Sequence, residues 1–527
     1  MKPLTHRFLA QITLEASAAF AINSGKLGLL NDNVVAKDAN RLPYLPGTSL
    51  AGVLRHSIGK SLENDLFGSK GNSGKEADSG SGSRLILSPG LMVGKEGKVI
   101  EGLQVIDFND SFYSAFGKLP LRDHVKINKK GSAEKGAKYD EELVFKGTRF
   151  VFELELKGTE QDQSSWAALL SLIESPDFRL GSGTRKGHGE FRVIHEKSTQ
   201  RTFDLRNEED LKDYLSKSSS LNSSIPKGTS ISTSAKKELA GWEKFQIQMK
   251  ARDFFLFGAG FGDGDVDHIS KMEKVITWSK GIPSISESDF ILIPATSIKG
   301  ALAHRVRFHY SKLIEDFIES PKDGYQPEAS LDFEKILGEI ESQIDFNNLT
   351  TETDEEIFKT LEKKINDFNP LKTAEWNSYE DQLRDEAANL IKAGSEPDES
   401  NYAVEKLFGF TKNSKGNEEK EKGQKGAVLI QDIYIPFKRE NNKVFNHVKI
   451  DRFTGGAIEG ALFQEKAYFG KNDQIELTIY VSSDALTEPL ISQTWQNVIN
   501  DLLNGLMPLG GLNTKGHGFF TGTLIKD

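Results

Sequence analysis

The chain contains no cysteine and no long apolar run. The absence of cysteine among its 527 residues excludes a disulfide framework, a cysteine-ligated zinc site and a thiol nucleophile. A membrane-spanning helix needs about 18 consecutive apolar residues, and no run in the sequence is that long. The length is typical of two to four domains. We therefore expect a soluble, cytoplasmic, multidomain chain without a membrane partner.

Positive charge is scarce overall but not in the body of the chain. Lys and Arg number 67 against 77 Asp and Glu, which gives a net charge of −10. Residues 311–400 alone hold 9 basic and 24 acidic residues, a net charge of −15, so the other residues carry +5. A mildly basic body is compatible with a polyanionic partner such as a nucleic acid.

Two copies of one sequence pattern lie in tandem. Four blocks recur in the same order, namely 45–56 at 293–304, 66–68 at 407–409, 124–127 at 447–450, and the glycine-rich loop 181–189 at 510–518. Self-similarity over so long a period indicates a duplication. We assign residues 1–200 to the first domain, the Ser-rich stretch 201–240 to a linker, and residues 241–527 to the second domain.

The second copy carries an insertion. The displacement between equivalent blocks grows from 248 to 341 residues after the first block, so 93 residues are extra. They lie at about 309–402, are acidic, and space their apolar residues as helices do. The insertion is either a solvated appendage or a docking element for another protein.

Both copies predict the same α+β domain. Alternating apolar residues predict strands at 8–14, 84–87 and 150–156, and at 245–249, 427–435 and 474–481. Helices are expected from Thr48 and Thr296 onward, and at 166–173 and 495–503. The order strand, helix, strands, helix, strand is that of a ferredoxin-like domain.

Two features of each copy suit phosphate. Helix N-termini offer backbone N–H groups, hydroxyls and nearby basic residues, here Thr48, Ser49 and Arg55, and Thr296, Ser297, Lys299 and Arg305. The glycine loops allow close backbone approach and add Lys186, His188, Lys515 and His517. The alternatives are ordinary capped helices and histidines that only stabilise a turn.

One loop of each copy contains carboxylates. Asp32 follows the Gly-rich exit from the first strand, and the equivalent loop of the second copy holds Asp263, Asp265 and Asp267. A loop carboxylate can hold a hydrated Mg²⁺ or orient a ribose hydroxyl for attack on phosphate. The alternative is that Asp263 and Asp265 only form a turn.

These blocks resemble the RAMP superfamily (repeat-associated mysterious proteins). The resemblance rests on Pro-Gly-Thr-Ser-Leu-x-Gly at 46–52, Leu-Phe-Gly at 66–68, both glycine loops, and residues 447–457. The last stretch contains Ile-Asp-Arg-Phe-Thr-Gly at 450–455 and is similar to the backbone subunits of type III CRISPR effector complexes. Two fused copies resemble the double backbone subunit of type III-D systems.

The resemblance implies a fold and a set of partners. It implies two modified RNA-recognition-motif domains with thumb hairpins at 124–145 and 447–463. These domains would bind a CRISPR guide RNA and its complementary target RNA, leaving specificity to base pairing. Their protein partners would be other type III subunits, including the large polymerase-cyclase subunit. Lys126, Lys449 and Arg452 on the hairpins complete the expected RNA-binding residues.

The resemblance also implies an activity. Target RNA would be cut at two sites about six nucleotides apart along the guide-bound strand. Asp32 and Asp267 would be catalytic and would hold Mg²⁺ or Mn²⁺, with Asp263 and Asp265 as weaker candidates. The first copy lacks the Asp-Arg-x-Thr-Gly signature after Ile127. Either site can therefore be a scaffold without catalysis.

Two other functions stay open at this point. The chain can be a non-catalytic subunit that forms the filament on guide RNA. It can also be a guide-processing endoribonuclease that uses metal-independent acid–base chemistry. The candidates for that chemistry are His56, His188, His304 and His517.

Chelation separates these functions. If the chain cuts target RNA with a divalent metal, we expect EDTA to abolish cleavage and added Mg²⁺ or Mn²⁺ to restore it. Gel analysis of labelled target RNA measures both. Cleavage that persists in EDTA would instead identify the metal-independent endoribonuclease.

Overall fold

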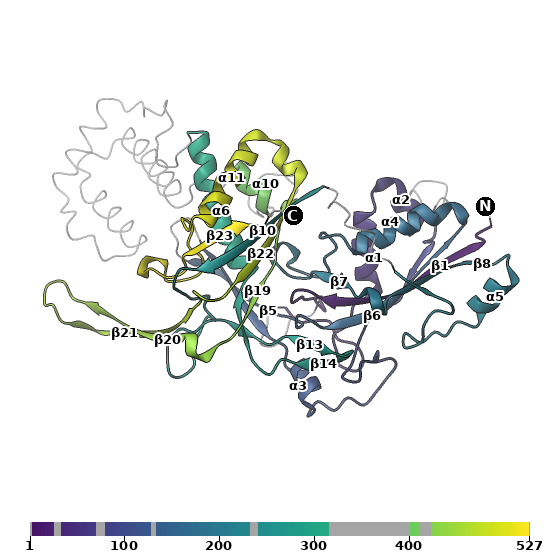
Figure 1. The fold of residues 1–527 in the computed structure, drawn as a ribbon, viewed down its shortest axis with the longest axis horizontal. Coiled ribbons are helices and arrows are strands. Elements are labelled where there is room, and N and C mark those ends of the chain that lie inside the picture. Colours follow the sequence, from purple (N-terminus) through teal and green to yellow (C-terminus); the bar gives the residue numbers. More distant parts are fainter. Residues whose placement is uncertain are drawn as a thin grey trace, which may run out of the picture. The chain divides into compact units, whose positions relative to one another are not determined.

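The structure is a computed structural model, and it describes residues 3–25, 33–69, 80–127, 133–231, 241–315, 401–410 and 423–525. It divides into two units, one made of Met1–Tyr310 with Ala403–Asp527 and the other of Ser311–Tyr402. The first unit contains both copies of the repeat (Figure 1). Asp32 and residues 316–400 of the expected insertion lie outside the described residues.

The first copy is an antiparallel sheet with helices. Its strands are β1 (His6–Ala16), β2 (Leu85–Leu87), β3 (Leu91–Met92), β4 (Leu121–Ile127), β5 (Ala133–Glu142), β6 (Arg149–Gly158), β7 (Phe191–Val193), β8 (Thr199–Asp204) and β9 (Thr229–Ser230). Its helices are α1 (Gly47–Ser57), α2 (Lys60–Phe67), α3 (Ser111–Gly117), α4 (Gln163–Ile173) and α5 (Glu208–Leu215). The sheet order is β2-β6-β1-β8-β9, with β3 paired to β6 and β7 to β1.

The second copy repeats this plan. Its strands are β10 (Trp242–Ala251), β11 (Phe254–Phe255), β12 (Met272–Glu273), β13 (Ile276–Ser279), β14 (Ile282–Ile285), β15 (Phe290–Ile293), β16 (Gly409–Phe410), β17 (Gln424–Lys425), β18 (Val428–Ile430), β19 (Ile433–Pro436), β20 (Asn442–Ile450), β21 (Ala457–Phe469), β22 (Ile475–Ser482) and β23 (Phe520–Leu524). Its helices are α6 (Ala295–Leu313), α10 (Tyr402–Phe408) and α11 (Pro489–Leu503). The sheet order β18-β22-β10-β23 is the ferredoxin-like order, which confirms the predicted fold class.

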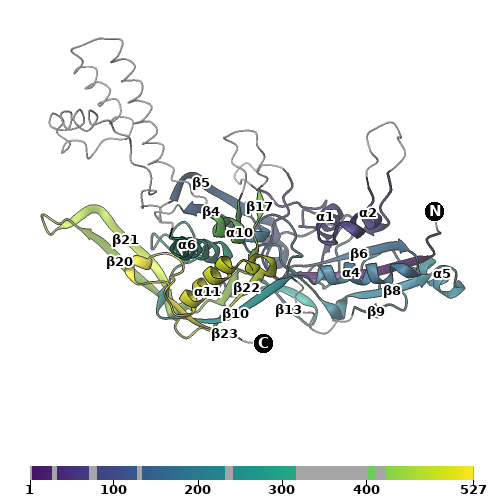
Figure 2. The ribbon, with the colours of Figure 1, turned by 90° about the horizontal axis from the view of Figure 1, so that it is seen from above.

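The same contact joins sheet and helix in both copies. Phe8 packs on Trp166 of α4, and Phe245 packs on Trp495 of α11, with ring centroids 5.9 Å apart in each pair. Both tryptophans are buried. Figure 2 shows α4 along the first sheet and α11 along the second. Aromatic burial of this kind stabilises a fold by about 1.5–3 kcal/mol for each fully buried Phe side chain.

Two expectations from the sequence need correction. The single strand expected at 427–435 is divided into β18 and β19, which join different sheets. The intervening Asp432 uses its carboxylate to bind Arg122 and the backbone N–H of Ala295. The linker expected at 201–240 begins later, because β8, α5 and β9 extend the first copy. Its serines also find partners there, as Ser220 does with Glu101.

The two copies share part of one core. Ile276 and Trp278 of the β13–β14 hairpin belong to the second copy by sequence but pack in the core of the first. The Ile276 N–H donates to the Lys146 carbonyl at 2.8 Å, and Trp278 Nε1 donates to the Gly147 carbonyl at 2.7 Å. The duplication has therefore produced one joined body rather than two independent domains.

The glycine loops offer a matched test of this joint. Gly187 and Gly516 are equivalent and have φ of 95° and 89°, so alanine costs about 1–2 kcal/mol at either position. Only at Gly187 would the new Cβ meet Ala295 of the second copy, at 2.3 Å, whereas no atom lies within 4 Å at Gly516. We expect Gly187→Ala to lower the free energy of unfolding by about 1–3 kcal/mol more than Gly516→Ala. Urea titration measures both, and equal losses would contradict the joint.

Candidate nucleic-acid interface

Basic side chains from both copies converge at their junction. The short helical turn Thr184–Lys186 carries Arg185 and Lys186, and left-handed glycines at 183 and 187 allow the backbone to enter and leave it. The first turns of α6 and the strand β17 present Lys299 and Lys425 to them. We call Arg185, Lys186, Lys299 and Lys425 the junction cluster.

The junction cluster carries more positive charge than the carboxylate bound to it can balance. Asp177 accepts hydrogen bonds from Arg185 at 3.0 Å and from Lys425 at 3.4 Å. Lys186 instead binds the Tyr139 hydroxyl, and Lys299 donates to the Phe408 carbonyl at 3.2 Å.

Three features of this cluster show that its positive charges are incompletely balanced. Among the described residues, Nε and Nη1 of Arg185 are buried without a hydrogen-bond acceptor, which costs about 1–3 kcal/mol for each unsatisfied group. Burial, followed by the charges of Lys186 and Arg185, lowers the pKa of Lys299 to about 8. Burial also lowers the pKa of Arg185 and of Lys425. A phosphate beside Lys186, Lys299 and Lys425 would relieve the repulsion between these cations.

The two helix N-termini differ from each other. The Ala295 N–H at the start of α6 donates to Asp432 Oδ1 at 2.8 Å. The carboxylate of Asp432 therefore already binds the N-terminus of the helix that carries Thr296 and Ser297. No side chain caps α1, where Thr48 is exposed and Ser49 half-buried. The repeat therefore presents one capped and one uncapped helix to a phosphate.

Two arginines of the expected set lie apart from the junction cluster. Arg55 donates to Glu63 at 2.9 Å and thereby joins α1 to α2. Arg305 pairs with Asp501 of α11. Both are engaged within their own copy.

The hairpins predicted at 124–145 and 447–463 are confirmed. Strands β4 and β5 pair in the first copy, and β20 and β21 pair in the second. At the second tip, Asp451 accepts the N–H groups of Phe453 at 2.9 Å and Thr454 at 2.7 Å. This closed turn leaves Arg452 exposed and Phe453 99% exposed. Lys126 and Lys449 are exposed at equivalent strand positions.

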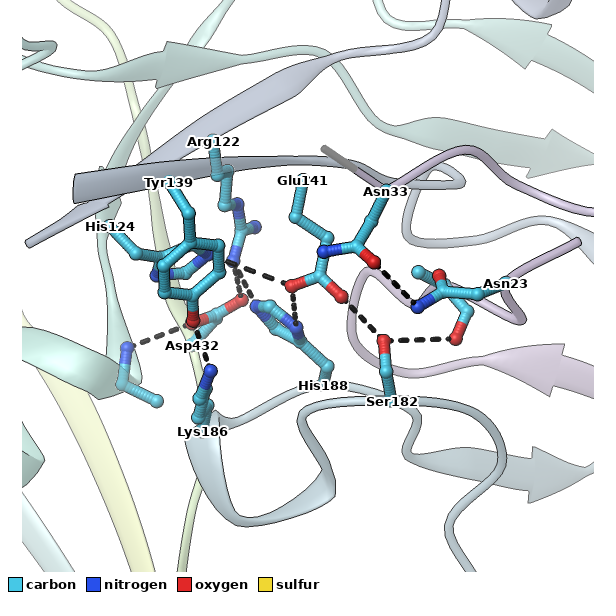
Figure 3. A network of polar contacts seen from close by, with 12 residues as sticks. Asn23, Asn33, Arg122, His124, Tyr139, Glu141, Ser182, Lys186, His188 and Asp432 are labelled. Carbon is cyan, nitrogen blue, oxygen red and sulfur yellow. Dashed lines mark hydrogen bonds and ion pairs between the residues drawn. The ribbon is translucent and has the colours of Figure 1, made fainter. Parts of the chain in front are cut away.

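The same group of side chains lies at the base of each hairpin. Its members are His124, Tyr139, Glu141, Lys186 and His188 in the first copy, and His447, Phe463, Glu465, Lys515 and His517 in the second. In each copy the hairpin histidine stacks on the aromatic ring, with centroids 4.9 and 4.8 Å apart, and the lysine lies 4.7 and 4.0 Å from that ring. Figure 3 shows the first of these groups. Lys186 and Lys515 are thus held in place by their own hairpins.

The first group has the spacing of a metal site, but one of its histidine nitrogens carries a proton where a metal would bind. Donor atoms of His124, Glu141 and His188 lie within 4.8 Å of one another. Arg122 Nη1 lies 3.3 Å from His188 Nε2, and because a guanidinium only donates, a neutral ring must carry its proton on Nδ1. That Nδ1 faces Glu141 at 3.6 Å and cannot bind a metal while protonated. His124 Nε2 and His188 Nδ1 lie 3.7 and 3.6 Å from Glu141 and make no hydrogen bond within the described part of the chain. We interpret the group as a packed anchor held by the stacking of His124 on Tyr139.

The histidines of this anchor are poorly placed for acid–base catalysis. Burial, followed by Lys186 and Arg122, lowers the pKa of His124 to about 4. Burial and the charge of Arg122 lower the pKa of His188 well below its usual value. The His188 side chain is also 0% exposed. Both rings are therefore neutral at pH 7, and His188 cannot reach an RNA chain.

Backbone pairing sets the register of the two aspartate loops. Asn33 pairs in parallel with Glu141, and His268 pairs in parallel with Glu465. Because Glu141 and Glu465 are equivalent, their partners Asn33 and His268 are equivalent too. Asp32 and Asp267, which directly precede these partners, therefore occupy matching positions in the sequence. Asp32 itself lies outside the described residues.

The three aspartates of the second loop have different surroundings. Asp263 binds Lys466 and accepts the Asp265 N–H at 3.2 Å, while the Asp265 side chain is 87% exposed. Asp267 Oδ2 accepts the Gln464 N–H at 2.7 Å. Its second oxygen takes no hydrogen bond from the part of the chain that is described.

Sequence reasoning missed several residues of this interface. Arg185 and Lys425 lie in or beside glycine-rich loops, so their basic charge next to glycine could have identified them as binding residues. Arg122 binds Glu273 and Asp432 across 151 and 310 residues of sequence, and no local pattern links them.

Comparison with known families agrees with this geometry. The RAMP superfamily model matches residues 13–192 and 280–521. The chain belongs to the RAMP superfamily. No curated protein matches it. The two matched regions make it a tandem RAMP protein, and membership suggests a CRISPR-associated RNA-binding subunit that works with RNA and other Cas subunits. In the described part of the chain, no helix is long and apolar enough to cross a membrane.

The pKa of Lys299 gives the RAMP junction a pH signature. Lys299 carries its charge below pH 8 and loses it as the pH rises further. We expect RNA affinity at fixed salt to fall above pH 8 by up to about tenfold per pH unit, since binding then takes up one proton. Lys299→Arg should remove this decline between pH 7.5 and 9. Fluorescence anisotropy with a short single-stranded RNA measures it, and an equal decline in the variant would contradict the assignment.

Proposed function

We propose that the chain is a double backbone subunit of a type III CRISPR effector complex, similar to those of type III-D. It binds guide RNA through its backbone and cleaves complementary target RNA at two sites about six nucleotides apart, leaving sequence reading to base pairing. The observation that carries the proposal is the junction cluster, in which Lys299 and Lys425 of the second copy lie beside Arg185 and Lys186 of the first.

The two hairpins support a role in shaping the RNA. Phe453 and the neighbouring basic residue Arg452 project from the second tip into solvent. An inserted hairpin must displace a base from the stack, which costs a few kcal/mol, and an exposed apolar tip offsets that cost. A kink at this point would bring the ribose hydroxyl in line with its own phosphate.

Asp267 suits the role of the loop carboxylate. One of its oxygens is fixed by the Gln464 N–H, so the other has a defined direction. A carboxylate oxygen is the ligand that Mg²⁺ and Mn²⁺ prefer, usually with water and phosphate completing the shell. A divalent ion held there would neutralise charge on the scissile phosphate. Asp267, together with Asp32 in the first copy, is the residue that we assign to hold it.

A non-catalytic filament subunit is the second candidate. The observation in its favour is that Lys466 pairs with Asp263 and lies 3.7 Å from Asp265, so a lysine already neutralises the other carboxylates of that loop. Of the histidines named for the metal-independent alternative, His188 and His517 are buried and unsuited to it, whereas His56 and His304 are exposed.

Single substitutions distinguish these candidates. In the assembled complex we expect Asp32→Ala and Asp267→Ala each to erase one cut while guide RNA stays bound, and the double variant to erase both. The loss at each site should reach at least about a hundredfold, as for removal of a group that acts in the transition state. Mapping of 5′-labelled target fragments measures it. Asp484→Ala, at an exposed aspartate of the second copy, is the matched control. Both cuts persisting in the double variant would contradict the catalytic assignment.

A further inference from the structure

One buried arginine joins the first hairpin to the second copy. Arg122 lies near the start of β4, and its side chain is 4% exposed. Its Nε and Nη2 donate to the two oxygens of Glu273 at 2.6 and 2.8 Å, and Nη1 donates to Asp432 Oδ2 at 2.6 Å. The remaining donors reach the Tyr434 hydroxyl at 3.0 Å and His188 Nε2 at 3.3 Å. All five N–H groups of the guanidinium are used.

These partners lie on several elements of both copies. Glu273 is on β12 and Tyr434 on β19, both in the second copy, whereas His188 is on the glycine loop of the first. Asp432 uses its other oxygen to cap α6. Arg122 therefore connects the first hairpin, the first glycine loop and α6, as Figure 3 shows for Arg122, Asp432 and His188.

The charge balance makes this connection rigid. Burial opposes ionisation, but the charges of Asp432 and Glu273 raise the pKa of Arg122 well above its usual value. If Arg122 were removed, two carboxylates would be left facing each other without their main cation. Breaking a buried ion network in this way is strongly destabilising.

Within the described ranges, the second hairpin has no ion network at the equivalent position. Phe445 occupies the position equivalent to Arg122 and packs on Phe254 at 4.9 Å and on His517 at 5.2 Å, within its own copy. The ion network is therefore a feature of the joint between the copies and not of every hairpin.

We propose that Arg122 is a positioning residue that fixes the distance between the two hairpins. This inference rests on the proposed function: the distance between the hairpins sets the spacing of the two cuts on target RNA. The spacing is then built into this chain and does not depend on neighbouring subunits or on the guide.

The lack of cysteine allows a direct test on the full chain without RNA. Lys138 and Leu462 pair with the equivalent residues Val125 and Val448, and their side chains are about two-thirds exposed. Spin labels on Lys138→Cys and Leu462→Cys would report the hairpin separation by pulsed electron paramagnetic resonance. We expect one narrow distance distribution, and at least a twofold wider one after Arg122→Met.

Two further variants keep the test decisive. Arg84→Met removes a mostly buried arginine that pairs with Asp162 at 3.0 Å inside the first copy, so it should lower stability but leave the distribution narrow. We call Arg122, Glu273 and Asp432 the clamp. Glu273→Gln keeps the shape of the clamp and removes one charge. This variant should widen the distance distribution even if Arg122→Met does not fold. An unchanged width in Glu273→Gln and in any folded Arg122→Met would overturn the proposal.

Fragment mapping then links the clamp to RNA. In the assembled complex, Glu273→Gln should spread at least one of the two cuts over neighbouring nucleotides while guide RNA stays bound. Sharp cuts at unchanged spacing, together with a widened hairpin distribution, would overturn the link between clamp and cut spacing. Absence of cleavage in the unaltered complex would refute the proposed activity, and the resonance experiment would still decide the clamp.

Discussion

A buried guanidinium must be neutralised, and in this chain the neutralising carboxylates belong to the other copy of the repeat. Arg122 is held by Glu273 and Asp432, so the copies cannot separate without leaving charges unpaired in a dry environment. The same contact places the first glycine loop beside α6. The arrangement of the junction cluster depends on this constraint.

Excess positive charge in the junction cluster is the feature that suits this structure to binding a polyanion. In the junction cluster Arg185 and Lys425 pair with Asp177, whereas Lys186 and Lys299 bind the Tyr139 hydroxyl and the Phe408 carbonyl. Two donor atoms of Arg185 have no acceptor among the described residues. A polyanion resolves this imbalance without any sequence reading, which suits a protein that holds RNA by its backbone. The anchors at the hairpin bases hold Lys186 and Lys515 beside aromatic rings, so little side-chain freedom is left to lose on binding.

Much of the fold follows from sequence, because periodicity and repetition are local or regular signals. The duplication, the ferredoxin-like domains and the basic glycine loops are predicted in this way, whereas both hairpins are predicted from the resemblance to the RAMP superfamily. The division of 427–435 into two strands was not, since it depends on Asp432 meeting Arg122 from 310 residues away. Serine content indicated a linker at 201–240, but Ser220 hydrogen bonds to the first copy. The match of Asp32 to Asp267 is made from the sequence, and the pairing of Asn33 and His268 with equivalent glutamates supports it.

The central claim is that this tandem RAMP protein holds guide RNA, and the RNA bound in cells tests it most directly. The chain would be tagged in its native cells and purified gently, and the RNA that accompanies it would be sequenced. The account predicts short RNAs that share a constant end joined to varied spacers, together with companion subunits. Protein free of RNA and of companion subunits would contradict the account and leave a duplicated α+β protein with an unfilled anion site.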